Sequence, residues 1–170
     1  VNDTPRARMR GGSPRIVFGT PIMRSAFSGD LELTRLLLEY GADPLIKSSD
    51  NETALGAATG TGFIHGYHFQ HPYSERLDLI KLLIEEYELE VNWHDDYGIT
   101  PLMAAGNLGD VPIIEYLIEQ GADLGDYDLG KKNDGNFGAS IEPLMPIDYA
   151  IGVGTFRPNN AIVLNEPAVE

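Results

Sequence analysis

The feature that most constrains this chain is an internal repeat with a period of 33 residues. A start of the form Thr-X-Ile or Thr-X-Leu recurs at Thr20, Thr53 and Thr100, and a fainter copy reads Glu-Pro-Leu at residues 142–144. Successive steps are 33, 47 and 42 residues, which equal 33, 33 plus 14, and 33 plus 9. Repetition at a fixed period of this size indicates stacked supersecondary units, so we expect an array rather than one mixed core.

A second landmark follows each start in phase with the first. It reads Gly-Ala-Asp at residues 41–43 and 121–123, and Glu-Leu-Glu at residues 88–90. The step from Glu88 to Gly121 is again 33 residues. Because both landmarks keep the same period, the longer gaps are best explained as whole insertions into otherwise regular repeats.

Each repeat carries the signals of a pair of short helices. The threonine at each start can accept a backbone N–H as a helix cap, and a proline suits the next position, where its missing N–H costs nothing. A Gly-Asp pair then allows a tight turn and caps the second helix in repeats one and three. The predicted first helices cover residues 21–27, 54–59 and 101–107. The predicted second helices cover residues 31–40, 76–87 and 111–120.

The second helices carry one apolar stripe each. In the first of them, Leu33, Leu36, Leu37 and Tyr40 follow the i, i+3, i+4, i+7 spacing of a single helix face. Such a face is expected to pack against the next unit of the array. We therefore predict that one leucine from each second helix is buried between neighbouring repeats: Leu36, Leu83 and Leu117.

These residues resemble the ankyrin repeat, whose period is 33 and whose signature is a Thr-Pro-Leu start. The resemblance covers about residues 19–152 and implies an all-α solenoid of stacked helix-turn-helix units with β-hairpin fingers. The chain is also similar to multi-repeat ankyrin proteins of bacteria, some of them exported, which carry long inserts between paired helices.

The resemblance divides the chain into a basic N-terminal arm, residues 1–18, and an ankyrin-repeat domain, residues 19–170. The expected repeats are about 19–51, 52–98 with an insert at 61–74, 99–131, and a divergent, truncated copy at 132–170. Five arginines and one aspartate give residues 1–24 a charge of +4, whereas the remainder sums to −18. An acidic body repels phosphate backbones, so nucleic-acid binding is not expected.

Other classes of protein are disfavoured by what the sequence contains. The apolar runs are much shorter than the roughly 18 residues of a membrane span, so we expect no such span. The chain has no cysteine, which excludes disulfides and thiolate metal sites. Adjacent carboxylates such as Asp95 and Asp96 diverge rather than share a reacting atom, and no nucleophile motif is present. We therefore expect neither catalysis nor a cofactor, and leave the location as soluble, cytoplasmic or exported.

The insert at 61–74 holds the most conspicuous side chains. Three histidines lie three residues apart, and three imidazoles can hold zinc or another divalent metal: His65, His68 and His71. They are weak metal candidates, because no Cys or Glu of a metal motif accompanies them. The aromatic residues of the insert are candidate partner-binding residues, or else rings that pack over the helix stack: Tyr67, Phe69 and Tyr73.

The connecting segments supply a second set of candidates. Trp93, His94 and Tyr97 lie between repeats two and three, and an exposed Trp beside Tyr and acids is a common composition for a binding hot spot. The alternative is that Trp93 packs against the neighbouring finger. The acidic segment 126–137 resembles a calcium loop poorly, because Gly130 stands where a third oxygen ligand should be. An irregular surface loop is the simpler interpretation.

Three functions are compatible with these features. The first is a non-catalytic scaffold that binds a protein partner through its fingers and concave face. The second is a structural subunit or segment of a larger ordered assembly, since an uncapped solenoid end exposes apolar surface. The third, a minor alternative, is a metal-dependent role of the histidine-rich insert.

Overall fold

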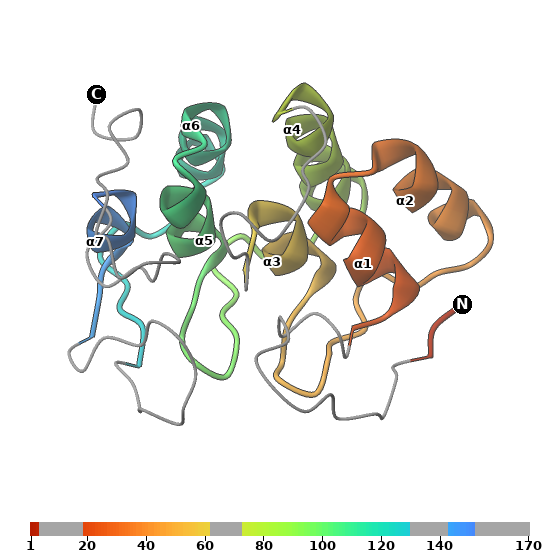
Figure 1. The fold of residues 1–170 in the computed structure, drawn as a ribbon, viewed down its shortest axis with the longest axis horizontal. Helices are drawn as coiled ribbons and strands as arrows, with labels where there is room; N and C mark the ends of the chain where they lie inside the picture. The colour runs from red at the N-terminus through yellow and green to blue at the C-terminus, as the bar shows by residue number, and fades with distance from the viewer. Residues whose placement is uncertain (4–18, 62–72, 130–142, 152–170) are drawn as a thin grey trace, which may run out of the picture.

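The computed structural model describes residues 1–3, 19–61, 73–129 and 143–151 (Figure 1). The predictions for the basic arm beyond residue 3, for most of the insert and for segment 130–142 concern residues outside these ranges. The helices, in chain order, are α1 (Pro21–Ser28), α2 (Leu31–Glu39), α3 (Ala54–Thr59), α4 (Tyr73–Lys81), the π-helical η2 (Leu82–Glu86), α5 (Pro101–Leu108), α6 (Val111–Glu119) and α7 (Pro146–Ala150). Among them, none has the length and apolar character that a bilayer crossing requires.

The helices form two rows, as Figure 1 shows. The inner row is α1, α3, α5 and α7, in which each helix packs on the next. The outer row is α2, α4 and α6, and the connecting loops extend from the opposite side of the inner row. The predicted all-α array of helix pairs is therefore confirmed.

The helix starts follow the predicted cap chemistry. The Oγ1 atoms of Thr20, Thr53 and Thr100 each accept a hydrogen bond from the backbone N–H three residues later. The three distances are 3.4, 3.1 and 3.3 Å. Asp30 caps α2 and Asp110 caps α6 in the same way. Because each cap satisfies a backbone donor that the helix leaves unpaired, short helices of six to nine residues can begin at fixed points.

The core runs along the interface between the two rows. Small residues of the inner helices let neighbouring repeats approach closely, and all six residues of α3 are buried. Leu83 and Leu117 are 0% exposed, as predicted. The prediction for Leu36 is wrong, because this side chain is 48% exposed. It lies on the edge of the array, on a face of α2 that the described residues leave largely exposed.

Repeat two departs from its neighbours at the end of its outer helix. Glu88 takes the place of Gly41 and Gly121 and has a φ of +55°, a left-handed conformation that costs a non-glycine residue about 1–2 kcal/mol. Glu88 follows Leu83 by five positions, whereas Gly121 follows Leu117 by four. The π-helical turn η2 accommodates this extra residue, so the landmark that follows keeps its phase.

Two further expectations differ from the structure. The finger loops are defined here as finger 1 (residues 43–52), finger 2 (91–99) and finger 3 (123–129 and 143–144). Their described residues contain no strand, so the predicted β-hairpins are not shown. The first helix of repeat four begins at Pro146, three residues after the Pro143 that the Glu-Pro-Leu copy indicated. Both prolines suit a first helical position, and the sequence alone does not separate them.

Candidate functional site

Each finger loop is closed by a side chain at one equivalent position. In finger 2 the buried Asp95 uses Oδ1 to accept the N–H groups of Tyr97 and Ile99, at 2.8 and 2.9 Å. Ser48 does the same in finger 1 with its hydroxyl, and Asp128 in finger 3 accepts the Leu144 N–H at 2.9 Å. Asp95 therefore shapes its loop, while the adjacent Asp96 is exposed.

Backbone hydrogen bonds connect neighbouring fingers. The Asp96 N–H donates to the Asp50 carbonyl at 3.1 Å, and the Leu129 N–H donates to the Tyr97 carbonyl at 2.9 Å. At Gly98, which has a φ of +79°, a β-carbon would stand 2.8 Å from the Leu129 nitrogen. A glycine there lets two loop backbones touch, so the three fingers are held as one surface.

Trp93 is not the exposed anchor that its composition suggested. The side chain is 7% exposed and packs against α3, where a β-carbon at Gly56 would stand 3.1 Å from its ring. The Lys47 Nζ lies 5.8 Å from the ring centroid, within the range of a cation–π contact. Trp93 thus joins finger 1, finger 2 and α3, which is the alternative that the sequence left open for this residue.

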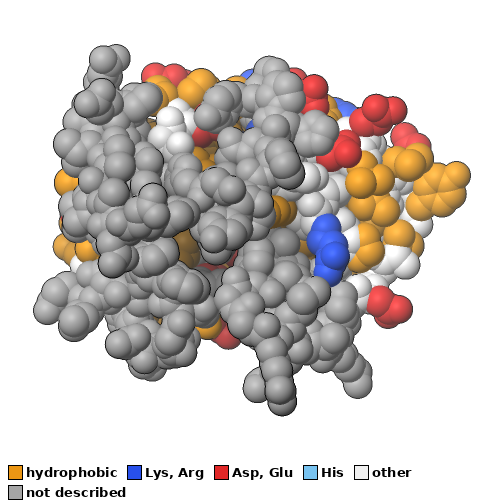
Figure 2. Space-filling view, in the orientation of Figure 1, with side chains coloured by type: hydrophobic (Ala, Val, Ile, Leu, Met, Phe, Trp, Pro, Cys, Tyr) orange, Lys and Arg blue, Asp and Glu red, His pale blue; other side chains and the backbone are white. Residues whose placement is uncertain are grey.

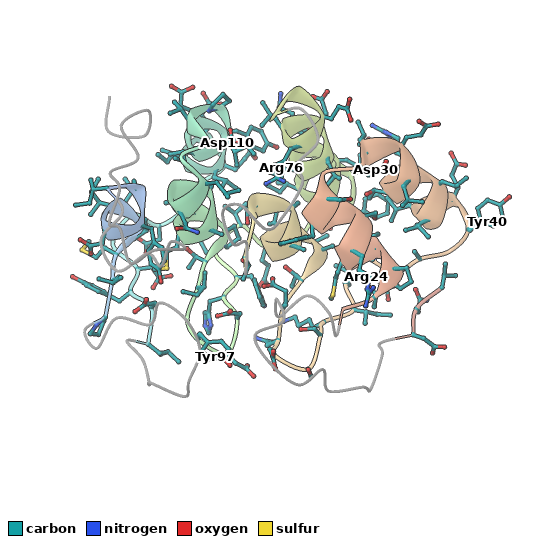
Figure 3. The ribbon with its side chains drawn as sticks, viewed as in Figure 1. Arg24, Asp30, Tyr40, Arg76, Tyr97 and Asp110 are labelled. Atoms are coloured by element: carbon teal, nitrogen blue, oxygen red, sulfur yellow. The ribbon has the colours of Figure 1, made fainter. Side chains whose placement is uncertain are left out.

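The backbone bond from Leu129 to Tyr97 brings fingers 2 and 3 together, and we call their exposed and half-buried side chains the finger surface. Its members are His94, Asp96, Tyr97, Tyr127 and Leu129. His94 and Asp96 are exposed, Tyr97 is half-buried, and Tyr127 and Leu129 are 56% and 59% exposed. Figure 3 shows Tyr97 near the loop end, away from the helix rows.

The sequence did not single out Tyr127 or Leu129, because they belong to a segment interpreted only as a poor calcium loop. The sequence did contain a signal for both residues. Tyr127 comes six positions after Gly121, as His94 comes six positions after Glu88, and Leu129 directly follows the loop-closing Asp128. Within that segment Asp128 is 8% exposed, and its Oδ2 accepts the Tyr149 hydroxyl at 2.6 Å. This carboxylate is therefore already used in holding finger 3 to α7.

The fingers carry mostly negative charge. Carboxylates occupy six described positions of the three loops outside the loop-closing sites, of which only Glu52 is buried: Asp43, Asp50, Glu52, Asp96, Asp123 and Asp126. Against them, Lys47 is the described cation of the same loops, and its ammonium lies over Trp93. The chemistry of the fingers is thus an aromatic and apolar patch in an acidic frame.

The candidate residues of the insert are not placed by the structure. His65, His68 and His71, with Tyr67 and Phe69, lie outside the described residues. Tyr73 begins α4, but its side chain is also outside the described part. Within the described residues, no group of three or more His, Cys, Asp or Glu side chains could hold a metal ion.

A buried polar pair that the sequence did not indicate lies at the opposite end of the helices from the fingers. Arg76 is 1% exposed, and its Nη2 donates to the Phe27 carbonyl at 3.5 Å. Asp110, labelled with Arg76 in Figure 3, is buried at the start of α6. Burial raises the pKa of Asp110, while the Ile113 N–H bond and the Arg76 charge act to lower it. We interpret both residues as structural, since Arg76 bonds a carbonyl of repeat one and Asp110 caps α6 of repeat three.

Comparisons with known proteins agree with this architecture. Residues 22–128 match the family description "Ankyrin repeats (3 copies)". The chain is 27% identical over 132 residues to Alpha-latrocrustotoxin-Lt1a of Latrodectus tredecimguttatus, covering 77% of this chain and 7% of that protein. It is 33% identical over 102 residues to Protein fem-1 homolog A-like of Mus musculus, covering 59% of this chain and 13% of that protein.

The chain spans a small fraction of these relatives, and a similar match to Alpha-latroinsectotoxin-Lt1a of Latrodectus tredecimguttatus also covers 7% of that protein. Neither a bacterial relationship nor the long insert is confirmed by these matches. Ankyrin repeats generally mediate protein–protein interaction, and the family is generally non-catalytic. With the matched region covering all three complete helix pairs, the chain belongs to the ankyrin-repeat family.

Proposed function

We propose that this chain is a non-catalytic scaffold that binds a protein partner through the finger surface and the adjoining concave face. The observation that carries the proposal is the backbone bonding between fingers, at Asp96 to Asp50 and Leu129 to Tyr97. Loops that are already held in place lose little conformational entropy when a partner binds. Recognition also concentrates on loops that a rigid frame positions.

The side chains of the finger surface suit a partner with apolar and basic groups. Tyr97 and Tyr127 offer aromatic area at low entropy cost, and Tyr127 is 56% exposed. The carboxylates around them favour a basic segment and would make association slower as salt is added. Trp93 supports this patch from beneath, since it is buried, whereas His94 and Tyr97 keep the contact role that the sequence suggested for all three.

The insert remains a second proposed contact region through Tyr67, Phe69 and Tyr73. The described residues that flank it lie at the C-terminal end of α3 and the start of α4, whereas finger 1 leads into the opposite end of α3, so we propose that the two regions meet different parts of a partner. Deletion of residues 63–73 is the direct test. Unchanged affinity for the partner would restrict the binding site to the fingers.

The first experiment captures the partner at a defined position. A photo-crosslinking phenylalanine analogue replaces Tyr97 in the full chain, and the same analogue replaces Ile118, an exposed residue of α6, as the control. We expect a protein cross-linked from position 97 and absent from position 118. Equal cross-linking from both positions would argue against the finger surface.

The second experiment measures affinity for the captured protein with two matched charge reversals. Asp96→Lys lies on the finger surface and Glu86→Lys lies on η2, and both side chains are exposed. Each substitution changes the net charge by the same amount, so a general electrostatic effect is shared. We expect Asp96→Lys to weaken binding about tenfold more than Glu86→Lys, with both melting temperatures close to the parent value.

A further inference from the structure

The outer helix of repeat one exposes an apolar face at the edge of the array. Figure 2 shows apolar side chains gathered over this edge, and Figure 3 shows Tyr40 pointing away from the helix stack. Leu33, Leu36 and Tyr40 are 42%, 48% and 74% exposed. Leu33 and Leu36 lie on one side of α2, and Tyr40 continues that side at the C-cap of the helix. The exposed groups therefore form a stripe and are not isolated surface residues.

Two of these three helix positions are buried inside the array, while Gln120, the equivalent of Tyr40, is exposed. Counted from the capping aspartates, Leu33 and Leu36 are equivalent to Ile113 and Tyr116 of α6, which are 0% and 7% exposed. The preceding repeat covers Tyr116, whose hydroxyl donates to Glu85 Oε1 at 2.9 Å. The sixth position after the cap is thus a contact between successive outer helices in the interior of the array.

An independent observation comes from two asparagines. Asn92, in the segment that leaves the outer helix of repeat two, donates through Nδ2 to the Gly121 carbonyl at 3.0 Å. Its Oδ1 accepts the Asp123 N–H at 2.8 Å. Asn2 makes the same two bonds with repeat one, to the Gly41 carbonyl at 3.4 Å and from the Asp43 N–H at 2.9 Å.

Among the described junctions, this pair of bonds joins repeat two to repeat three. The position of Asn92, four residues after its landmark, is held by Leu45 in repeat one and by Gly125 in repeat three, neither of which has a side-chain amide. Asn2 therefore makes the same two hydrogen bonds with repeat one that Asn92 makes with repeat three. Val1 and Val91, the residues before the two asparagines, are also the same.

We propose that the Leu33–Leu36–Tyr40 face is a repeat-stacking interface whose occupant is a further ankyrin-type helix pair, joined to repeat one through Val1 and Asn2. The exposed stripe gives the contact surface, and the asparagine bonds give the register in which the added pair stacks. The proposal concerns the edge of the array and does not depend on the partner of the finger surface.

The test measures protection of this face. The chain has no cysteine, so single-cysteine variants can be labelled at one site. The rate of thiol labelling of Leu36→Cys is compared between the 170-residue chain and a chain extended by one consensus ankyrin repeat placed directly before Val1, in the register that Asn92 defines. Leu45→Cys, on finger 1 and 59% exposed, is the control outside the face.

We expect extension to slow labelling of Leu36→Cys about tenfold or more and to leave Leu45→Cys unchanged, because only the first site becomes buried. A second variant, Leu36→Glu, should leave the melting temperature of the 170-residue chain nearly unchanged and lower that of the extended chain. Equal Leu36→Cys labelling in the two chains would overturn the proposal. Protection that rises with concentration in the shorter chain would also overturn it, since a second copy would then cover the face.

Discussion

Repeats one and three have closely similar landmarks but bury different parts of their outer helices. Both begin with Thr-Pro, turn at Gly-Asp and end at Gly-Ala-Asp. Yet Tyr116 of repeat three is 7% exposed, while Leu36, the equivalent residue of repeat one, is 48% exposed. The comparison teaches that burial in an array is set by the neighbouring layer, whereas helix ends and turns are set within each repeat.

The largest test of this comparison is a pair of truncations. Leu83→Ala, in the interior, should lower the free energy of unfolding by about 2–5 kcal/mol because it leaves a cavity between repeats. Leu36→Ala, on the edge, should cost less than about 1 kcal/mol, since much of its side chain is already in water. Chemical denaturation of the two variants measures both values. Similar losses at the two positions would contradict the difference between edge and interior.

The next test asks whether the free-energy cost of placing a β-carbon at a residue with positive φ is the same at the edge and in the interior of the array. Gly41→Ala on the edge and Gly121→Ala in the interior should each cost about 1–2 kcal/mol, because both sites have a positive φ. A β-carbon at either position meets nothing within 4 Å, so packing does not distinguish them. Glu88→Gly should instead stabilise the protein by roughly 0.5–1 kcal/mol. Unequal costs at the two glycines would show that this local rule fails in one setting.

A smaller difference is expected between the capping aspartates. Burial raises the pKa of Asp110 above its usual 3.8, so the folded state binds this proton more tightly than the unfolded state. Protonation of Asp110 therefore stabilises the fold fully at pH values below the pKa of this carboxyl in the unfolded state. This contribution is lost as the pH rises through its raised pKa in the folded state. Across that window, parent stability should fall relative to Asp110→Asn, which has no titrating carboxyl but still caps a helix.

Asp30→Asn is the matched control for this experiment, because it changes the same cap on the edge repeat, where the side chain is half-buried. Denaturation of the parent and the two variants at several pH values gives the comparison. A stability difference between parent and Asp110→Asn that stays constant with pH would mean that burial of the Asp110 carboxyl does not govern its titration.

The smallest effect is expected at the end of α2. Tyr40 is equivalent to Gln120 in repeat three, so Tyr40→Gln copies the interior residue onto the edge. Tyr40 is exposed, and the substitution should change stability by less than about 0.5 kcal/mol. Thermal unfolding measures this change. A larger loss would indicate that Tyr40 packs on the rest of repeat one more closely than its exposure suggests.

The sequence predicted the parts of this fold that depend on local chemistry. Thr53, for example, signals its own helix because the cap uses a backbone N–H only three residues away. It could not predict the burial of Trp93, because the cover comes from Gly56 and Lys47 in other segments. For a related reason the sequence does not separate Pro143 from Pro146 as the start of α7, which packs on α5.

The hydrogen bonds between fingers have a consequence for how such a protein can evolve. Because Asp96, Tyr97 and Leu129 use main-chain atoms to join the loops, the spacing of the fingers is not encoded in their outward-facing side chains. The side chains of His94 and Asp96 can therefore be exchanged at little cost to folding. Under the proposed function, single substitutions at these side chains would change the choice of partner while the bonds that hold the loops together stay the same.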